Sequence, residues 1–353
     1  MNSKIKIGNK WIGKGYPVFI IAEAGVNHNG DLSLAKKLID LAKGSGADAV
    51  KFQTFKAEEI VTPRIGKASY QKNITSPQES QYEMLKRLEL KDSDFKTLAA
   101  YANKKNIIFL SSPFDKKSVD LLEEIGVSAF KIASGEITNL PLLEYIAKKD
   151  KPIILSTGMA SLDEIKQALQ VINTAGKQEV ILLHCVTSYP VKIEEVNLKA
   201  IITLGKKFNL LVGFSDHTEG IIAPAAAVVL GACIIEKHFT FDKNLPGPDH
   251  SASLGPEELK SLVRAVRDTE KALGNGLKQP TAAEEAIKIY ARKSIVAKVD
   301  IPRGVYIKED MLSIKRAGKG IEPKYLKDIV GKIIKRSIKK DQPLFMELIR
   351  KQK

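Results

Sequence analysis

Leu210–Thr240, LLVGFSDHTEGIIAPAAAVVLGACIIEKHFT, contains the unit from which the fold can be predicted. We expect strands over its two apolar runs, Leu210–Asp216 and Cys233–Thr240, and a helix over the alanine-rich segment Ala223–Leu230 between them. The two runs are apolar throughout and do not alternate, which is typical of parallel strands buried on both faces. Both runs end in polar residues.

The same unit recurs between residues 17 and 273. The strand candidates are Val18–Ala24, Ala49–Phe55, Ile107–Pro113, Ala129–Gly135, Pro152–Gly158, Val180–Thr187, Leu210–Asp216 and Cys233–Thr240. Longer charged segments with helical spacing separate them, and a last helix is expected over Pro256–Leu273. Eight β–α units in about 250 residues predict a (β/α)8 TIM barrel. A doubly wound sheet is the alternative, but it gives no reason for eight even repeats.

Nearly every strand candidate ends in polar residues of the kinds that catalyse reactions. These are Glu23, Lys51-Phe52-Gln53, Ser111-Ser112, Lys131 with Ser134 and Glu136, Ser156-Thr157, Thr187-Ser188-Tyr189, Ser215-Asp216-His217 and Glu236-Lys237-His238. Polar side chains within apolar strands are costly to bury without partners. Because the carboxyl ends of barrel strands converge on one mouth, we expect the active site there.

His217 and His238 end the seventh and eighth strand candidates. Neighbouring strands lie about 4.8 Å apart, so matching positions can share one ion. Neutral imidazoles with open remaining positions suit Mn²⁺, Zn²⁺ or a similar Lewis acid. Glu23 at the mouth and Asp216 beside His217 favour a metal site. The alternative is that both histidines are hydrogen-bonded structural residues.

A cationic, hydroxyl-rich rim is expected from Lys51, Lys131, Ser112, Ser134, Ser156 and Ser215. Such groups hold a phosphate or a carboxylate. A lysine in a barrel strand could instead form a Schiff base with a carbonyl substrate, or be a solvated rim residue. In the turn after the eighth strand, Asp249 could accept hydrogen bonds from substrate hydroxyls. The long aperiodic connection Lys56–Ser80 suggests a lid or a subunit contact.

The composition excludes several classes of protein. A chain of 353 residues with 44% hydrophobic and 27% charged residues is globular rather than disordered. The longest uncharged apolar run, Ile221–Ile235, is too short to span a bilayer, and no signal peptide is recognised. Cys185 and Cys233 both lie within apolar runs, which argues against a disulfide-stapled secreted module. We therefore expect a cytoplasmic protein without a membrane partner.

The net charge of +15 is concentrated in the C-terminal segment. Residues 293–353 contain 17 Lys and Arg against 7 Asp and Glu, or +10 of the total. A basic chain suggests nucleic-acid binding. This segment, however, lacks a continuous basic helix and its aromatic residues are scattered, so we expect no nucleic-acid partner. The predicted organisation is a barrel over 1–274, a linker over 275–292 and a small domain over 293–353.

Several strings closely resemble the sialic acid synthase family. They are IAEAGVNHNG (21–30), VKFQ (50–53), KIASGE (131–136), LSTGM (155–159), GFSDHT (213–218), EKHFT (236–240) and PGPDH (246–250). The string KRAGKGI (315–321) resembles the C-terminal antifreeze-like (SAF, β-clip type) domain of that family. The resemblance runs in order from about residue 16 to the end.

This resemblance implies the condensation of phosphoenolpyruvate (PEP) with an N-acylmannosamine-type sugar, with cleavage of the C–O bond of PEP. The products are a nonulosonic acid and phosphate. The first expectation is an N-acetylneuraminate synthase that uses N-acetylmannosamine. The alternative within the family is a legionaminic acid synthase that uses 2,4-diacetamido-2,4,6-trideoxymannose. A more distant alternative is a Schiff-base pyruvate aldolase.

The resemblance also implies roles for individual residues. His217 and His238 would bind a divalent ion, typically Mn²⁺, with Mg²⁺ or Co²⁺ as alternatives. Glu23 would be the acid/base catalyst. PEP contacts map onto Lys51, Ser112, Lys131, Ser134, Ser156, Thr187 and Ser215. Sugar contacts map onto Gln53, Glu136, Tyr189 and Asp249. The family often has Thr at the position of Ser112 and Asn at that of Thr187.

The family's antifreeze-like domain covers the barrel mouth of a partner subunit, and an arginine there meets the sugar's N-acyl group. Arg316 occupies that motif position. The resemblance therefore implies a homodimer with a swapped C-terminal domain.

Overall fold

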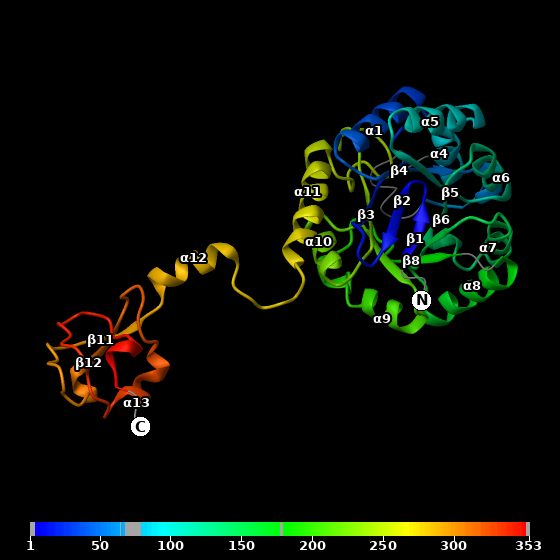
Figure 1. The fold of residues 1–353 in the computed structure, drawn as a ribbon. Coiled ribbons are helices and arrows are strands. Elements are labelled where there is room, and N and C mark those ends of the chain that lie inside the picture. The colour runs from blue at the N-terminus through cyan, green and yellow to red at the C-terminus, as the bar shows by residue number, and fades with distance from the viewer. Residues whose placement is uncertain (1–3, 64, 68–78, 177–178, 351–353) are drawn as a thin grey trace. The chain divides into compact units, whose positions relative to one another are not determined.

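The computed structural model describes residues 4–63, 65–67, 79–176 and 179–350. They form two compact units, Met1–Gly274 and Asn275–Lys353 (Figure 1). Each unit is described by itself below.

Eight parallel strands surrounded by helices form the first unit (Figure 1). The strands are β3 (Phe19–Gly25), β4 (Ala49–Thr54), β5 (Ile108–Pro113), β6 (Phe130–Ile132), β7 (Ile153–Ser156), β8 (Val180–Cys185), β9 (Leu211–Asp216) and β10 (Ile234–His238). Their order is β5-β4-β3-β10-β9-β8-β7-β6, and β5 and β6 at its two ends also contact each other. The sheet is thus a nearly closed barrel, and the predicted TIM barrel is confirmed.

Helices follow the strands and cover the outside of the barrel. They are α1 (Leu32–Gly44), α5 (Asp92–Lys104), α6 (Lys116–Ile125), α7 (Leu140–Ala147), α8 (Leu162–Ala175), α9 (Ala200–Phe208), α10 (Ile222–Val229) and α11 (Pro256–Leu273). Successive strand residues point to opposite faces. Ile20 accordingly packs in the layer between strands and helices, whereas Ile21 packs inside the barrel. Both faces of the strands are therefore apolar, as their sequences require.

A short antiparallel hairpin closes the end of the barrel at which the strands begin. It consists of β1 (Lys4–Ile7) and β2 (Lys10–Gly13), and in Figure 1 it lies across the barrel. Ile7 and Ile12 of the hairpin are fully buried and belong to the same apolar cluster as Ile21 of the barrel interior. The opposite end, where the strands terminate, is the mouth.

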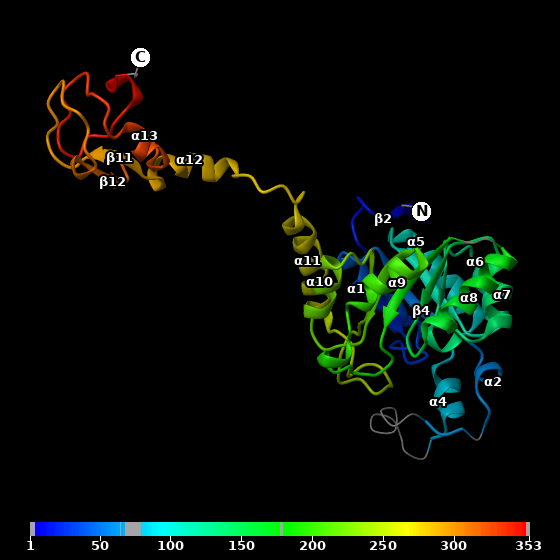
Figure 2. The ribbon, with the colours of Figure 1, turned by 90° about the horizontal axis from the view of Figure 1, so that it is seen from below.

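Two further helices, α2 (Ala57–Ile60) and α4 (Gln81–Leu88), lie at the mouth end, on the side opposite the N-terminal hairpin (Figure 2). The helix α2 belongs to the connection Lys56–Ser80, for which a lid or subunit contact was expected. Residues 64 and 68–78 of this connection lie outside the described residues, so that expectation stays a prediction.

The second unit is a small domain with its own aliphatic core. Its elements are α12 (Ala282–Ala291), β11 (Ser294–Ala297), β12 (Leu312–Lys315) and α13 (Leu326–Ile329), with short 3-10 turns between them. The strands β11 and β12 pair antiparallel. The core contains Ile295, Ile301, Ile307, Leu312, Ile321, Ile329, Ile334, Ile338, Leu344 and Ile349. Within the described part of the chain, no helix combines the length and the apolar character needed to cross a membrane.

Candidate active site

The residues singled out in the barrel sequence lie at the carboxyl ends of the strands or in the loops that follow. Glu23 is on β3, Lys51 and Gln53 on β4, Ser112 on β5, Lys131 on β6, Ser156 on β7, Ser215 on β9 and His238 on β10. Ser134 and Glu136 lie in a 3-10 turn after β6, Thr187 and Tyr189 after β8, His217 directly after β9, and Asp249 after β10. The parallel topology thus brings side chains from distant parts of the sequence to one mouth.

Four buried charged side chains form the centre of this mouth. Lys51 is ion-paired with Glu23, and its Nζ lies 3.5 Å from Glu236 Oε2. The Nζ atom of Lys131 lies 3.3 Å from Glu236 Oε1. None of the four residues is more than 4% exposed. Two ammonium groups and two carboxylates therefore compensate one another, and an anionic ligand would have to compete with the carboxylates for the lysines.

Serine hydroxyls lie beside these charges. Lys51 Nζ donates to Ser112 Oγ at 3.2 Å, and Lys131 Nζ donates to Ser156 Oγ at 2.8 Å. On the neighbouring strands, Ser215 Oγ donates to Glu236 Oε1 at 2.9 Å. Each amine is thus accompanied by a hydroxyl, which is a suitable combination for holding phosphate or carboxylate oxygens.

The two carboxyl groups have pKa values shifted in opposite directions. Burial raises the pKa of Glu23, and the nearby charge of Lys51 offsets this only in part. Burial also acts to raise the pKa of Glu236, but Lys131 and Lys51 outweigh it and lower that pKa. Such a split separates a carboxyl that can exchange protons from one that stays ionised.

His217 and His238 lie side by side, with ring centroids 5.7 Å apart. The backbone carbonyl of Val186 can only accept, so the His217 Nδ1 atom 2.7 Å away is the donor, and in the neutral ring the lone pair is on Nε2. The Nδ1 atom of His238 is buried and has no hydrogen-bond partner among the described residues. Burial and the neighbouring His217 lower the pKa of His238 well below its usual value, which favours the neutral form that binds metals.

These two imidazoles fit a divalent ion. Tyr189 packs on His217 with ring centroids 4.1 Å apart, and its ring meets His238 edge-on. The described residues contain no cluster of three His, Cys, Asp or Glu side chains that could hold a metal. Two histidines would therefore leave most coordination positions to water or substrate, which is typical of catalytic rather than structural sites.

The loops after β6, β7 and β8 bring Ser134 and Thr187 together around Gly158. Ser134 Oγ accepts a hydrogen bond from Gly158 N at 3.0 Å. Thr187 Oγ1 is buried and has no hydrogen-bond partner among the described residues. A Cβ atom at position 158 would collide with the Thr187 hydroxyl and would lie 2.7 Å from Ser134 Oγ.

The residues expected to contact a sugar lie around this centre. Burial raises the pKa of Asp249 to about 6, although the nearby His217 acts in the opposite direction. Gln53 approaches the first strand, because a Cβ on Gly25 would lie 3.4 Å from Gln53 Nε2 and 3.2 Å from Glu23 Oε1. At the rim, Glu136 accepts a hydrogen bond from Asn139 Nδ2 at 2.7 Å.

Arg316 belongs to the second unit, where it follows β12 and is exposed. The structure thus brings the barrel candidates to one mouth, while Arg316 is held by a separate domain.

Sequence reasoning gave no role to Glu236, although this residue binds both mouth lysines. The signal was present, because residues two apart on a strand face the same side and Glu236 precedes His238 by two. Cys185 was also given no role, yet its Sγ lies 3.8 Å from His217 Nδ1.

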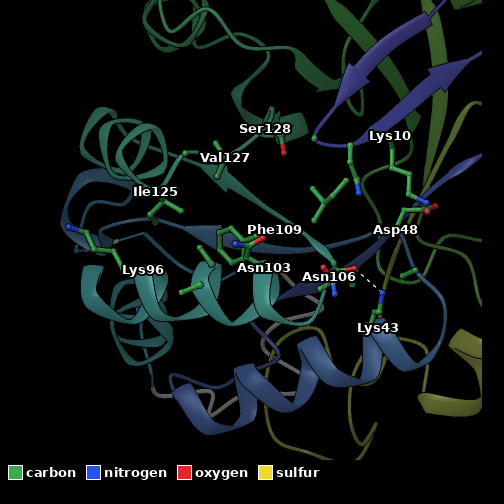
Figure 3. Close-up of a pocket in the computed structure, with 18 of the residues that line it drawn as sticks. Lys10, Lys43, Asp48, Lys96, Asn103, Asn106, Phe109, Ile125, Val127 and Ser128 are labelled. Carbon is green, nitrogen blue, oxygen red and sulfur yellow. Dashed lines mark hydrogen bonds and ion pairs between the residues drawn. The ribbon is translucent and has the colours of Figure 1, made fainter.

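A second cavity, of about 770 Å³, lies where the strands begin, away from the mouth (Figure 3). Each of its three lysines contacts a protein oxygen. Lys10 Nζ lies 3.1 Å from Asp48 Oδ1, and Lys96 Nζ lies 2.5 Å from Glu124 Oε1. Lys43 Nζ donates a hydrogen bond to the carbonyl oxygen of Asn106 at 2.8 Å. Figure 3 shows the lysines spread around the rim rather than converging on one point. The mouth therefore remains the candidate active site.

Comparison with known proteins shows the family to which the chain belongs. The N,N'-diacetyllegionaminic acid synthase of Campylobacter jejuni is 54% identical over 325 residues, covering 92% of this chain and 97% of that protein. The synthase of the same name from Legionella pneumophila is 48% identical and covers 99% of both chains.

Among solved structures, the N-acetylneuraminic acid (sialic acid) synthetase of Leptospira borgpetersenii has a TM-score of 0.71 and is 42% identical. The match covers 80% of this chain and 94% of that one. The sequence model of the NeuB family matches residues 38–278, and that of the SAF domain matches residues 292–350. The expected resemblance is therefore confirmed, and the chain belongs to the NeuB family, with a C-terminal SAF domain.

Proposed function

We propose that this protein is a nonulosonic acid synthase that condenses PEP with 2,4-diacetamido-2,4,6-trideoxymannose to give N,N'-diacetyllegionaminic acid and phosphate. The observation that carries the reaction class is the buried cluster of Lys51, Lys131, Glu23 and Glu236 beside two histidines. The sugar is chosen because the two synthases compared are 48–54% identical to this chain. They favour the legionaminic acid alternative over the N-acetylneuraminate reading that the sequence first suggested. N-Acetylmannosamine remains the second candidate, supported by the 42% identical sialic acid synthetase.

PEP binding replaces internal ion pairs with contacts to the substrate. The phosphate and carboxylate of PEP take the positions that Glu23 and Glu236 hold around Lys51 and Lys131. Ser112 and Ser156 already hydrogen-bond these amines and turn to the same anionic oxygens. The unpartnered hydroxyl of Thr187 supplies a further donor, which supports the assignment of this residue to PEP.

His217 and His238 would hold the divalent ion, for which we propose Mn²⁺. When bound, such an ion acts as a Lewis acid that makes the sugar aldehyde carbon more electrophilic. The hydrogen bond to Val186 fixes the ring of His217, and Tyr189 packs against both imidazoles. Asp249 and Gln53 are placed to receive hydroxyl and amide groups of the sugar.

The bond changes follow from this placement. The electron pair of the PEP double bond forms a bond from C3 to the aldehyde carbon, and the aldehyde oxygen takes a proton from Glu23. Water then adds at the cationic C2, and its proton returns to Glu23. In the tetrahedral product of that addition, the bond from C2 to the bridging oxygen breaks, the C2 hydroxyl becomes the ketone carbonyl, and its proton leaves with the phosphate. The raised pKa of Glu23 suits a group that must both give and take a proton near neutral pH.

We further propose that the protein acts in the cytoplasm as a homodimer in which the SAF domain of one subunit reaches the mouth of its partner. The second unit has features that support an intersubunit role. Its helix α12 buries no residue, and Ile287 and Tyr290 on that helix are 56% and 77% exposed. Apolar side chains at this exposure are typical of a surface that another chain covers.

The proposed reaction is tested by phosphate release from PEP in the presence of Mn²⁺, with each of the two candidate sugars. The 2,4-diacetamido sugar should give the higher kcat/KM, and EDTA should abolish turnover. PEP labelled with ¹⁸O in its bridging position should give labelled phosphate, because the C–O bond breaks.

Absence of phosphate release with both sugars would reject the proposed reaction. Covalent trapping of pyruvate by borohydride, together with activity that survives EDTA, would instead support a Schiff-base aldolase. Burial lowers the pKa of Lys131, so this control is a real test of that lysine.

A further inference from the structure

A second buried ion pair lies on the other face of the strands that carry the two histidines. Asp216 on β9 and Lys237 on β10 are register partners, and their side chains form an ion pair. Their side chains are 0% and 2% exposed. They alternate with the residues that face the mouth, so this pair does not touch the substrate site.

Apart from each other, these two side chains hydrogen-bond only Thr218 among the described residues, and Thr218 directly follows His217. Besides the ion pair, Lys237 Nζ donates to the Thr218 carbonyl oxygen at 2.6 Å. Asp216 accepts from Thr218 N at 2.9 Å and from Thr218 Oγ1 at 3.1 Å. One ammonium group thus holds the residues on both sides of His217, and it belongs to the residue directly before His238.

The ring of His238 has few other supports. Its Nδ1 atom has no hydrogen-bond partner among the described residues, whereas His217 Nδ1 donates to Val186. Apart from the ring contacts with Tyr189 and His217, the orientation of His238 therefore depends on its backbone. A buried ion pair is costly to desolvate, and apolar replacements of similar volume are often neutral or stabilising. Stability alone is thus a weak reason for placing two charges here.

We propose that Asp216 and Lys237 are positioning residues that fix the spacing of His217 and His238 and thereby set the affinity of the site for its divalent ion. This inference rests on the metal site of the proposed function. The four side chains form two layers across the same pair of strands, with the imidazoles facing the mouth and the ion pair behind them. Partners that orient metal ligands typically contribute 10–100-fold to metal affinity.

The test uses the full chain and measures Mn²⁺ binding directly, from the free-ion signal in electron paramagnetic resonance, with thermal unfolding in parallel. Lys237→Met alone leaves a buried unpaired carboxylate and can prevent folding. The informative variant is therefore the double substitution Asp216→Leu with Lys237→Met, which removes both charges of this pair and leaves neither of them unpaired. Its matched control is Asp120→Asn with Lys149→Met, which removes an ion pair of 2.7 Å between α6 and the turn after α7, away from the mouth.

We expect the double variant to fold with a Tm close to that of the wild type and to bind Mn²⁺ about 10–100-fold more weakly. The control should bind like the wild type. A folded double variant with wild-type Mn²⁺ affinity would overturn the positioning role and leave the metal site intact. A wild-type protein that binds no Mn²⁺ would overturn the metal site itself. The two failures are therefore distinguishable.

Discussion

Gly158 leaves room for two hydroxyl groups that a single methyl group would displace. Its α-carbon faces Thr187 and Ser134, and Ser134 also accepts the hydrogen bond of its amide. The arrangement proposed to bind PEP thus depends on the absence of a side chain at this residue.

We predict that Gly158→Ala lowers kcat/KM for PEP by about 100-fold, because small displacements of positioned groups have effects of that order. The KM for the sugar should change much less. Gly135→Ala is the matched control, since a Cβ at this neighbouring position meets nothing within 4 Å. Steady-state kinetics that show equal effects of the two substitutions would contradict this reading of Gly158.

The sequence located single residues better than it located their partners. Lys51 and Lys131 could be assigned to the mouth because each ends an apolar strand. The partnership of both with Glu236 could not be predicted, because it depends on the order and stagger of strands far apart in the chain. For the same reason the hydroxyl of Thr187 could be named but not placed beside Gly158.

At the scale of elements, the loop after β3 contains the buried His28 and is tied to the loop after β10 through the buried His250. His28 accepts a hydrogen bond from Gly30 N at Nδ1, at 3.0 Å. His250 lies between the Thr240 hydroxyl, 2.6 Å from Nδ1, and the Asn29 side-chain oxygen, 3.2 Å from Nε2. Burial lowers the pKa of each histidine to about 4.

We predict that His28 and His250 each contribute a loss of barrel stability as the pH falls from 6.5 to 4, opposite in sign to the contributions of Glu23 and Asp249, whose pKa values are raised. In that window the unfolded chain takes up protons at His28 and His250, whereas the folded chain does not. The free energy of unfolding should fall by about 3 kcal/mol for a fully buried histidine such as His28. Urea unfolding at several pH values measures this slope. His28→Gln should flatten it, and an unchanged slope would show that His28 is not the group that titrates.

The sequence predicted some helices and strands more accurately than others. The barrel strands and the helices expected over Ala223–Leu230 and Pro256–Leu273 were predicted within a few residues, since the strands have strong apolar patterns and the helices have helical spacing or an alanine-rich sequence. The hairpin of β1 and β2 was not predicted, because four-residue strands have too short a pattern to recognise. The isoleucines of these strands are buried because they pack against the end of the barrel, and that end forms only once the eight strands have assembled.

At the scale of the whole molecule, the proposed swapped dimer makes a prediction about Arg316. Arg316→Ala should raise the KM for the sugar while barely changing the KM for PEP, because the arginine is assigned to the N-acyl group. Arg336→Ala is the control, another exposed arginine of the same domain. An unchanged sugar KM in the Arg316 variant would reject the assignment.

Mixing two defective variants tests whether this arginine acts in the partner subunit. Glu23→Gln and Arg316→Ala affect different units, so a mixed dimer with swapped domains contains one mouth in which both residues are intact. Unfolding and refolding the two variants together should therefore restore turnover at a sugar concentration far below the KM of the Arg316 variant, where neither variant alone is appreciably active. No recovery in verified mixed dimers would show that the arginine acts within its own chain.

The hairpin of β1 and β2, at the end of the barrel where the strands begin, also determines how molecules can reach the active site. Isoleucines of β1 and β2 join the apolar filling of the barrel, so that end offers no polar route to Lys51 and Lys131. Substrates and products must then enter and leave through the mouth. The proposed reaction takes up PEP, the sugar and water and releases two products, so binding and release must be ordered: the substrate that binds first lies deepest, and what it becomes leaves last.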